Sequence, residues 1–313
     1  MKDLRLNCKT NYLHIILFEK ITMKIVCIPA YNEESHIENL INSAKNHVDS
    51  VVVCDDGSTD NTANIAKKAG AVVISHKINK GYGAAIISLF DYARENNADI
   101  MITVDGDAQH DPAQIPLLVN TLTRHSVDVV IGSRFLNSNT EAPGYRQRGI
   151  KIITSAVNYG TDLKVSDSQS GFRAYSKNAI TAIHPTAEDM SVSTEILFKI
   201  SNKGLSLAEV PITISYDGDT SEHNPISHGV SVLANTVKYV SIKHPLQFYG
   251  IPGIVLIAIG VILGGLFLDG YLNNQVILYG MMAGSVVLFL LGAILSVTAV
   301  ILFSMANLIR DSK

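Results

Sequence analysis

The sequence predicts an α/β fold: a mainly parallel sheet with helices on both faces, followed by a C-terminal pair of membrane-spanning helices. Three observations support this. From Met23 onward, short apolar runs typical of buried strands alternate with segments whose apolar residues recur at helical spacing. Polar clusters follow four of these runs directly. Beyond residue 250, two apolar runs are long enough to cross a bilayer.

Composition sets the outer limits. The 313 residues suffice for one large domain or two of ordinary size. The formal net charge of −3 gives no support to bulk nucleic-acid binding. Cys8, Cys27 and Cys54 lack the spacing of a metal or redox motif. Cys27 and Cys54 lie in apolar runs, so we expect buried thiols and a reducing compartment.

Residues 1–22 are interpreted as an N-terminal extension of unknown role. Their apolar stretch, residues 12–18, is too short to span a membrane, and no small-residue cleavage pattern follows it. We therefore predict no signal peptide and begin the first domain, 23–225, at Met23.

Within this domain, strands and helices are expected to alternate, which is typical of a parallel sheet covered on both faces. The expected strands are 24–28, 51–54, 71–75, the apolar start of the 101–112 stretch, and 127–131. The expected helices are 35–45, 62–69 with Gly70 as its stop, and one opened by Gly81.

Polar side chains follow the strands of this predicted sheet directly. They are Glu33, Asp55, Asp56, Asp105, Asp107 and Arg134. Because the carboxyl ends of parallel strands share one edge, we expect these side chains to converge on one cleft. One such cluster is compatible with turn chemistry, with Asp60 or Asn61 capping the next helix. Four in succession favour a binding site.

The Asp105-Gly106-Asp107 cluster ends its strand on two carboxylates. Oxygen ligands with little imidazole suit a hard cation such as Mg²⁺ or Mn²⁺, which usually shares its shell with substrate phosphates. On these residues alone a polar turn before a helix starting at Pro112 is an equally good interpretation. Gly81-Tyr82-Gly83 lacks the third glycine of a dinucleotide fingerprint, so we expect a tight turn feeding a helix, with Lys80 near phosphate.

Six motifs occur in a recognisable order: Pro29-Ala30-Tyr31-Asn32-Glu33-Glu34, Asp55-Asp56-Gly57-Ser58-Thr59-Asp60, Lys80-Gly81-Tyr82-Gly83, Asp105-Gly106-Asp107, Gly132-Ser133-Arg134 and Ser170-Gly171-Phe172-Arg173. Over about residues 23–216 the chain resembles the family 2 glycosyltransferases, most of all the polyprenyl-phosphate group that includes dolichyl-phosphate mannose and glucose synthases. The resemblance implies a GT-A (nucleotide-diphospho-sugar transferase, Rossmann-like) fold and inverting transfer of a sugar from a nucleotide sugar to a lipid phosphate.

The resemblance also implies roles for individual residues. The nucleotide-sugar site would comprise Pro29, Tyr31, Glu33, Cys54, Asp55, Asp56, Lys80, Asp105, Gly106 and Asp107. The Mg²⁺ or Mn²⁺ ligands would be Asp105, Asp107 and Gln109. Contacts to the acceptor or diphosphate would come from Arg134, Arg146, Arg148 and Ser170. The catalytic residues would be Asp107, Arg134 and Asp167, the last being nearest the sugar; whether Asp167 acts as a base or only positions ligand stays open. Glu195 matches a family position but equally fits a surface charge.

The implied chemistry depends on charge. A phosphomonoester carries about −1.5 to −2 charge at neutral pH, so it is already a nucleophile and needs little general-base help. A cation would act on the leaving diphosphate as a Lewis acid. Arg134, Arg146, Arg148 and Lys151 would offset the remaining repulsion. For Arg146 and Arg148 a solvated loop is the alternative.

One segment departs from the family pattern. Where many relatives carry a basic Arg-Gly-x-Ser-Lys segment after the Val-Pro strand, this chain reads Tyr216-Asp217-Gly218-Asp219-Thr220-Ser221-Glu222-His223-Asn224-Pro225. The basic role would then fall to His223, His228 or an arginine elsewhere. This leaves the phosphate contacts and the donor sugar open.

The C-terminal part, 250–310, is predicted to be a transmembrane hairpin with spans at about 251–268 and 276–303, joined by a polar turn at 269–275. Lys238, Lys243, Arg310 and Lys313 lie on one side of it, which predicts a cytoplasmic catalytic domain. Residues 226–249 are expected to form a juxtamembrane amphipathic helix, and 150–163 is a weaker candidate. Core helices are the alternative for both.

Together these features predict a membrane-bound enzyme that transfers a hexose to dolichyl or another polyprenyl phosphate and makes a lipid-linked monosaccharide for glycosylation. UDP-glucose or UDP-N-acetylglucosamine is the favoured donor, ahead of GDP-mannose. A homo-oligomer through the hairpin is compatible with the sequence. The alternatives are a polysaccharide-type glycosyltransferase, although the chain lacks the tryptophan of its Gln-x-x-Arg-Trp motif, and a non-catalytic nucleotide-sugar-binding scaffold. A sugar nucleotidyltransferase would need a Gly-rich loop where Pro29 stands.

Overall fold

The computed structural model describes residues 22–136, 144–214, 225–274 and 279–311. The chain forms two compact units. The first comprises Met1–Glu141, Ser170–Glu188 and Leu205–Thr220, and the second comprises Ala142–Gln169, Asp189–Gly204 and Ser221–Lys313. The predicted extension up to residue 21, and the altered segment around His223, lie outside the described residues.

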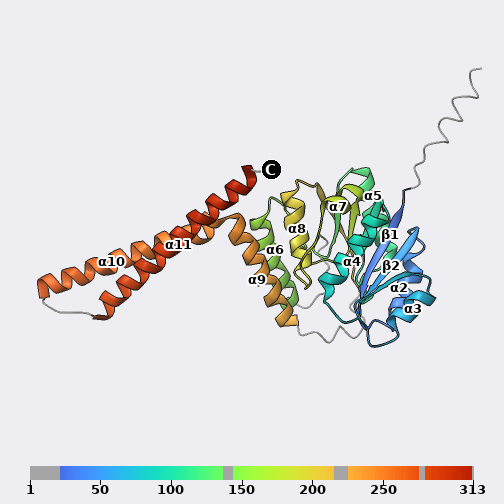
Figure 1. The fold of residues 1–313 in the computed structure, drawn as a ribbon, viewed down its shortest axis with the longest axis horizontal. Helices are drawn as coiled ribbons and strands as arrows, with labels where there is room; N and C mark the ends of the chain where they lie inside the picture. The colour runs from blue at the N-terminus through green and yellow to red at the C-terminus, as the bar shows by residue number, and fades with distance from the viewer. Residues whose placement is uncertain (1–21, 137–143, 215–224, 275–278, 312–313) are drawn as a thin grey trace, which may run out of the picture. The chain divides into compact units, whose positions relative to one another are not determined.

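The first unit holds one seven-stranded sheet, with strand order β3-β2-β1-β4-β6-β5-β7 (Figure 1). The strands are β1 Lys24–Ala30, β2 Ser50–Asp55, β3 Val72–Ser75, β4 Ile100–Thr103, β5 Val129–Ser133, β6 Arg173–Ser176 and β7 Leu207–Pro211. All neighbours pair in parallel except β6, which is antiparallel to both β4 and β5. The predicted mainly parallel α/β sheet is therefore confirmed, with one antiparallel strand added.

Helices cover both faces of this sheet. Successive side chains of a strand point to opposite faces, and those of the central strands are apolar on both, so both faces need cover. One face packs α2 Ile37–Ala44, α3 Thr62–Lys68 and α5 Ile115–Arg124 against residues such as Val26 and Ile102. The other face packs α4 Tyr82–Glu95 and α7 Lys177–Ala182, with the Phe90 and Tyr175 rings 5.0 Å apart edge to face. Between β4 and α5 lies the short 3₁₀ turn η2, Pro112–Gln114. Cys27 and Cys54 are buried free thiols, as expected.

The second unit has its own packed helices: α6 Gly144–Gly160, α8 Val192–Asn202 and α9 Pro225–Lys243. They approach closely at Gly160, where a Cβ atom would lie 2.7 Å from Val240 and 2.8 Å from Phe198. Phe198 in turn stacks on Tyr239 of α9, with 4.9 Å between ring centroids. The helix predicted over 150–163 is present as α6, but it begins six residues earlier, at Gly144, and ends at Gly160.

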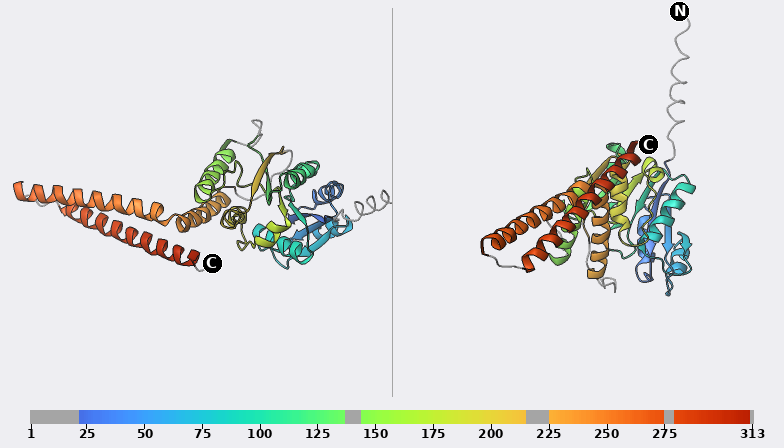
Figure 2. Two further views of the ribbon diagram at one scale, coloured as in Figure 1. Left: turned by 90° about the horizontal axis from the view of Figure 1, so that it is seen from above. Right: turned by 60° about the vertical axis from the view of Figure 1, so that its left-hand side comes forward.

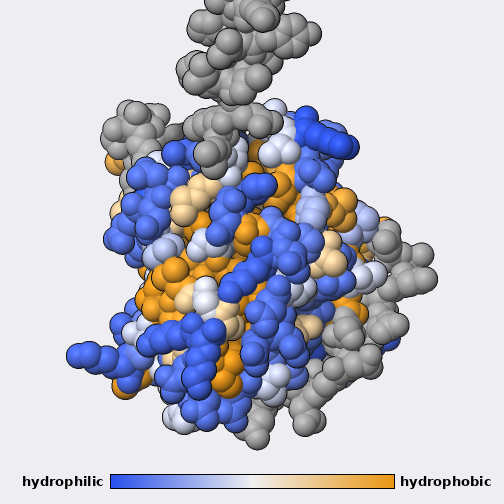
Figure 3. Space-filling view, turned by 90° about the vertical axis from the view of Figure 1, so that its right-hand side faces the viewer, coloured by the Kyte–Doolittle hydropathy of each residue, from blue (hydrophilic) through white to orange (hydrophobic). Residues whose placement is uncertain are grey.

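Helices α10 Ile251–Asn274 and α11 Tyr279–Asp311 form the hairpin (Figure 2). The segments Leu246–Asn273 and Tyr279–Leu308 have mean hydropathies of 2.6 and 2.9, and only 11% of each apolar window is buried. Apolar helices left so exposed are not core helices of a soluble domain. The face of the first unit in Figure 3 is, by contrast, largely hydrophilic, with hydrophobic side chains gathered between polar ones.

Two predicted boundaries near the hairpin are wrong. Residues 269–274 are helical rather than a turn, and Asn273 Nδ2 donates to Asp269 Oδ1 at 2.6 Å, so these polar residues satisfy each other one helical turn apart. The single helix predicted over 226–249 ends at Lys243. Pro245, which lacks an N–H group, follows it, and Leu246–Gly250 forms the π-helical turn η3 before α10.

Candidate active site

The loops after β1 and β2 are held together by their own polar side chains. Asn32 N–H donates to Ser58 Oγ at 2.9 Å, and Thr59 N–H donates to Asn32 Oδ1 at 2.9 Å. Glu33 N–H donates to Thr62 Oγ1 at 2.8 Å. Asn32 has a left-handed φ of 55°, a conformation that asparagine tolerates better than most residues. The sequence therefore uses polar side chains to fix this edge of the sheet.

Strand register places the predicted nucleotide residues next to each other. Pro29 is paired with Cys54 and Ala30 with Asp55, so Tyr31 and Glu33 follow β1 beside the two aspartates that close β2. Asp55 and Asp56 are both buried. Asp55 Oδ1 accepts from Ser58 N–H at 3.2 Å, which stabilises the turn after β2.

Asp56 is the anchor of the loop before α4. Its carboxylate accepts from Lys80 N–H at 3.0 Å and from Gly81 N–H at 2.7 Å, where Gly81 has a φ of 102° that favours glycine. His76 Nδ1 lies 2.6 Å from Asp56 Oδ1. His76 Nε2 in turn lies 2.9 Å from Ser88 Oγ of α4. The predicted turn into a helix at Gly81 is confirmed, and its backbone is bonded to Asp56, which directly follows β2.

Asp105 contacts polar side chains from two other parts of the first unit. The Tyr82 hydroxyl donates to Asp105 Oδ1 at 2.9 Å, and His110 Nδ1 lies 3.7 Å from Asp105 Oδ2. A Cβ atom at Gly171 would lie 2.3 Å from Asp105 Oδ1, so only glycine fits there. Burial raises the pKa of Asp105, although the Tyr82 hydrogen bond and the charges of Arg134 and Arg173 act in the opposite direction.

Asp107 and Glu33 add two more carboxylates to this edge. Burial and then the charge of Asp105 raise the pKa of Asp107. Burial, followed by the charges of Asp107, Asp60 and Asp105, raises the pKa of Glu33 to about 7. The loop that carries Asp107 passes close to the end of β1 at Gly106. A Cβ atom at Gly106 would lie 2.8 Å from the Pro29 carbonyl oxygen, so glycine permits this approach. The site thus concentrates negative charge that a bound cation would relieve.

The donor set of this edge fits a hard cation. Among the described residues, no three His, Cys, Asp or Glu side chains gather as a complete metal cage. Asp105 and Asp107 supply only carboxylate oxygens, which is the partial set that Mg²⁺ or Mn²⁺ takes when substrate phosphates complete its shell. Ala108, next along the loop, holds a left-handed φ of 56°, a strained conformation for alanine that is typical of functional loops.

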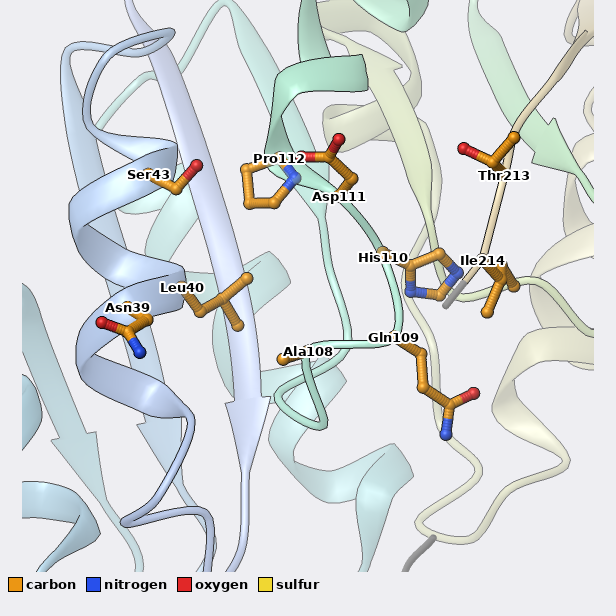
Figure 4. Close-up of a pocket in the computed structure, with 10 residues that line it drawn as sticks. All are labelled: Asn39, Leu40, Ser43, Ala108, Gln109, His110, Asp111, Pro112, Thr213 and Ile214. Carbon is orange, nitrogen blue, oxygen red and sulfur yellow. The ribbon is translucent and has the colours of Figure 1, made fainter. Parts of the chain in front are cut away.

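Gln109 lies on the same loop, but its surroundings differ from those expected of a ligand. Its N–H donates to Asp107 Oδ1 at 3.1 Å, while its side chain lines a shallow pocket of about 490 Å³ (Figure 4). That pocket lies between α2 and the loop; the lining residues are Asn39, Leu40, Ser43, Ala108, Gln109, His110, Asp111, Pro112, Thr213 and Ile214. Neither Asp105 nor Asp107 lines it, so this pocket is not the predicted nucleotide site.

The remaining predicted residues divide between the units. Arg134, directly after β5, and Ser170 belong to the first unit; Ser170 is buried, and its carbonyl accepts from Arg173 Nε at 2.8 Å. Arg146, Arg148 and Asp167 belong to the second unit. Arg148 is exposed and Asp167 is fully buried. Glu195 is also buried there, with Lys199 Nζ 2.9 Å away, so it is not a surface charge.

No sequence pattern assigns a role to His76, Tyr82 or Arg173. Tyr82 lies between Gly81 and Gly83, a pair that indicates only a turn. Arg173 is the last residue of the Ser170-Gly171-Phe172-Arg173 motif. His76 directly follows a strand, as the predicted site residues do, and that position is the signal that could have found it. All three touch or electrostatically influence Asp56 or Asp105.

A mainly parallel sheet with carboxylates clustered just beyond the carboxyl ends of its strands is typical of the ligand sites of α/β proteins. The chain belongs to glycosyl transferase family 2, whose sequence signature matches residues 25–183, and it is a glycosyltransferase. The resemblance inferred from the motifs is thereby confirmed.

Similar proteins with known activities indicate which members of family 2 this chain resembles. The chain is 34% identical over 216 residues to the UDP-N-acetylglucosamine–dolichyl-phosphate N-acetylglucosaminyltransferase of Methanococcus voltae, covering 60% of this chain and 84% of that one. It is 27% identical to the polyprenol monophosphomannose synthase of Mycolicibacterium smegmatis, covering 61% and 77%. The crystal structure of glucosyl-3-phosphoglycerate synthase from Mycobacterium tuberculosis with Mn²⁺ and UDP-glucose superposes with a TM-score of 0.58 at 24% identity, covering 70% and 79%. The last likeness shows the fold alone.

Proposed function

We propose that this protein is a membrane-bound, inverting glycosyltransferase that moves a hexose from a nucleotide-diphosphate sugar to dolichyl or another polyprenyl phosphate. The observation that carries the proposal is the half-buried Asp105 and Asp107 pair just beyond the end of β4. It occurs in a family 2 chain that also has a hairpin apolar enough to span a membrane. An acceptor with its phosphate at the surface and its chain in the lipid suits that combination.

In the proposed site, Pro29, Tyr31 and Glu33 line the base and ribose together with the Cys54 backbone. Asp55 and Asp56 lie next to them in the sheet, and a carboxylate there accepts the imide N–H of uracil or guanine. Lys80, held by Asp56, lies at the start of α4. Asp105 and Gly106, in the loop after β4, would face the ribose.

Asp105 and Asp107 would hold Mg²⁺ or Mn²⁺ on the donor diphosphate, whereas the side chain of Gln109, the third predicted ligand, lines a different pocket. When bound, the cation supplies Lewis-acid stabilisation to the leaving nucleoside diphosphate. The solved structures of the same fold that contain UDP with Mn²⁺ or Mg²⁺ support this assignment. Arg134, whose charge already acts on Asp105, would neutralise the diphosphate or the incoming acceptor.

The acceptor phosphate needs no base, because it is already ionised at neutral pH. Its oxygen forms a bond to the anomeric carbon from the face opposite the diphosphate, while the bond from that carbon to the diphosphate oxygen breaks, which inverts the configuration. Within the first unit, Arg134 and Ser170 would bind the diphosphate or the acceptor phosphate. The roles that the resemblance implies for Arg146, Arg148 and Asp167, which belong to the second unit, stay predictions. Cationic groups are needed because the reaction brings two anions together.

UDP-N-acetylglucosamine and UDP-glucose are the donors we favour, since the Methanococcus relative uses the former by name and the altered 216–225 segment departs from the mannose synthases. GDP-mannose is the second candidate, which the similarity to the monophosphomannose synthase supports. We place the catalytic domain, 23–225, on the cytoplasmic side, because Lys238, Lys243, Arg310 and Lys313 flank the spans there.

The test uses purified full-length protein in detergent with Mn²⁺ or Mg²⁺ and dolichyl or undecaprenyl phosphate. UDP-glucose, UDP-N-acetylglucosamine and GDP-mannose are offered separately, and glycolipid is detected by mass. We expect product from one donor and none from the Asp107→Ala variant. Absence of product with every donor and both acceptors, while UDP or GDP still binds, would contradict the proposal and favour a non-catalytic binding protein.

A further inference from the structure

Residues 212–214, which directly follow β7, connect the ends of two other strands within the first unit; we call them the β7 strap. Ile212 extends the pairing of β7 with β5, since its N–H donates to the Ser133 carbonyl at 3.0 Å. Ile214 forms an antiparallel bridge with His110, in the loop after β4. Three consecutive residues therefore join the end of β5 to the loop that follows β4.

The side chain of Gln114 holds the middle residue of the β7 strap. Thr213 N–H donates to Gln114 Oε1 at 2.9 Å, and Gln114 Nε2 donates to the Thr213 carbonyl at 3.0 Å. The carboxamide therefore pairs with both backbone groups of one residue, as a neighbouring strand would. Because β7 is the last strand of the sheet, these two groups would otherwise lie on its open edge. Gln114 thus fastens the strap to the last residue of η2.

The end of the β7 strap lies against His110, which faces Asp105. His110 is buried, its Nδ1 atom lies 3.7 Å from Asp105 Oδ2, and its ring centroid lies 5.3 Å from that of Phe172. Figure 4 shows the His110 ring beside Ile214. The strap therefore supports the loop three residues beyond Asp107.

This loop has support on one side only. Towards α2, residues 108–112 line the shallow pocket of about 490 Å³ (Figure 4). Ala108, directly after Asp107, holds a left-handed φ of 56°. A strained conformation persists only where the surrounding contacts define it, and the contacts made through the β7 strap are on the side away from α2.

We propose that Gln114 is a positioning residue for the metal site. Its carboxamide fixes the β7 strap, and the strap fixes, through His110, the loop that carries Asp105 and Asp107. In this role Gln114 does not bind the cation itself but acts through the Thr213 backbone. The inference rests on the metal site of the proposed function and is independent of the donor sugar and the acceptor. Its effect falls on cation affinity, because residues that orient metal ligands commonly change that affinity by about ten- to a hundredfold.

The test breaks the two hydrogen bonds from either side. Gln114→Met keeps the length of the side chain and removes both bonds, whereas Thr213→Pro removes the N–H donor of the other partner. Asn120→Met, at an exposed amide of α5, is the matched control. Each full-length variant in detergent is titrated with Mn²⁺ in the presence of UDP, or of GDP if wild type binds only that nucleotide, and free Mn²⁺ is measured by its electron paramagnetic resonance. Calorimetry gives the nucleotide affinity in EDTA.

We expect Gln114→Met and Thr213→Pro each to weaken Mn²⁺ binding about tenfold, and Asn120→Met to bind as wild type does. The double variant should lose no more than about a further twofold, because both substitutions break the same pair of bonds. Nucleotide affinity in EDTA should not change. If Gln114→Met fails to fold, Gln114→Asn, which is one methylene too short to reach Thr213, takes its place.

Wild-type Mn²⁺ affinity in Gln114→Met would overturn the proposal, even if its melting temperature fell, because the bonds would then serve folding alone. An equal loss of nucleotide affinity in EDTA would indicate general loosening of the site and would also overturn it. Absence of glycolipid from wild type would contradict the proposed function but leave this titration decisive. Absence of Mn²⁺ binding by wild type would remove the metal site and the role of Gln114 with it.

Discussion

His76 Nδ1 lies 2.6 Å from Asp56 Oδ1, and the opposite ring nitrogen of His76 lies 2.9 Å from Ser88 Oγ. Asp56 also accepts the N–H groups of Lys80 and Gly81. Because Asp56 is already the acceptor for these two backbone groups, its contact with His76 is satisfied when His76 donates through Nδ1. The histidine thereby fixes the rotamer of Asp56 and, through it, the loop that leads into α4.

His76→Ala should weaken nucleotide binding about tenfold, which corresponds to the roughly 1.4 kcal/mol expected from a lost hydrogen bond to a buried charge. His76→Asn keeps a donor near the position of Nδ1 and should retain affinity within about threefold. The measurement is calorimetric titration with UDP and GDP, alongside the KM for the nucleotide sugar. Equal losses in both variants would contradict a role that depends on the bond to Asp56.

Tyr82→Phe removes the hydroxyl that donates to Asp105 at 2.9 Å. We expect turnover to fall about tenfold, because a loss of about 1.4 kcal/mol in positioning the carboxylate corresponds to that factor in rate. Tyr92→Phe on the same helix α4 is the matched control and should keep wild-type turnover. An unchanged rate in Tyr82→Phe would show that this bond does not serve the reaction.

Much of this site is predictable from the sequence. An apolar run that is followed directly by carboxylates indicates a buried strand, and it also indicates that the carboxylates lie at the edge of the sheet where that strand ends. Asp55, Asp105 and Asp107 were placed in this way, and the register of β1 with β2 confirms the adjacency of the first two loops. The mainly parallel sheet follows from the same alternation of runs.

What escaped prediction depends on partners distant in sequence. Strand β6 has four residues and is antiparallel to β4, about 70 residues earlier, so no local period reveals it. The bond between Asp56 and His76 joins the ends of two strands across 20 residues. Likewise, the break of the juxtamembrane helix at Pro245 could have been read from the proline, but the apolar spacing on either side concealed it.

Asp107→Asn should abolish turnover while leaving the metal-free protein at least as stable as wild type, because it removes one charge from two half-buried carboxylates that repel each other. Mn²⁺ with UDP should raise the melting temperature of wild type through binding and should have little effect on the variant. Differential scanning fluorimetry in EDTA and in Mn²⁺ with UDP measures both effects. A variant that melts well below wild type in EDTA, or that responds equally to Mn²⁺ with UDP, would contradict the assignment of Asp107 to the cation.

Gly171→Ala should strongly reduce turnover, because its Cβ atom would lie 2.3 Å from Asp105 Oδ1 and must displace that carboxylate. Gly149→Ala is the control, since a Cβ atom there meets no heavy atom of the described residues within 4 Å. In a helix the control substitution is expected to be neutral or to stabilise by up to about 1 kcal/mol. Turnover and thermal unfolding of both variants are compared; wild-type activity of Gly171→Ala would show that Asp105 tolerates displacement.

The hairpin helices pack through small residues, which allows their backbones to approach closely. A Cβ atom at Gly260 would lie 2.9 Å from Phe289 N and 3.0 Å from the Ser285 carbonyl oxygen, whereas one at Gly265 on the same helix would meet no described atom within 4 Å. Ser285 Oγ also donates to the Gly260 carbonyl at 2.8 Å.

Gly260→Leu should therefore separate α10 from α11 and lower the thermal stability of the full-length protein in detergent, while Gly265→Leu should not. The substitutions add the same side chain to the same helix, so the difference between them isolates helix contact from hydrophobicity. Unfolding is followed by the loss of helical circular dichroism on heating. Because hairpin packing is separate from the carboxylate edge, both variants should still bind UDP with wild-type affinity below their melting temperatures. Equal melting temperatures for the two variants would mean that the close approach at Gly260 does not hold the hairpin together.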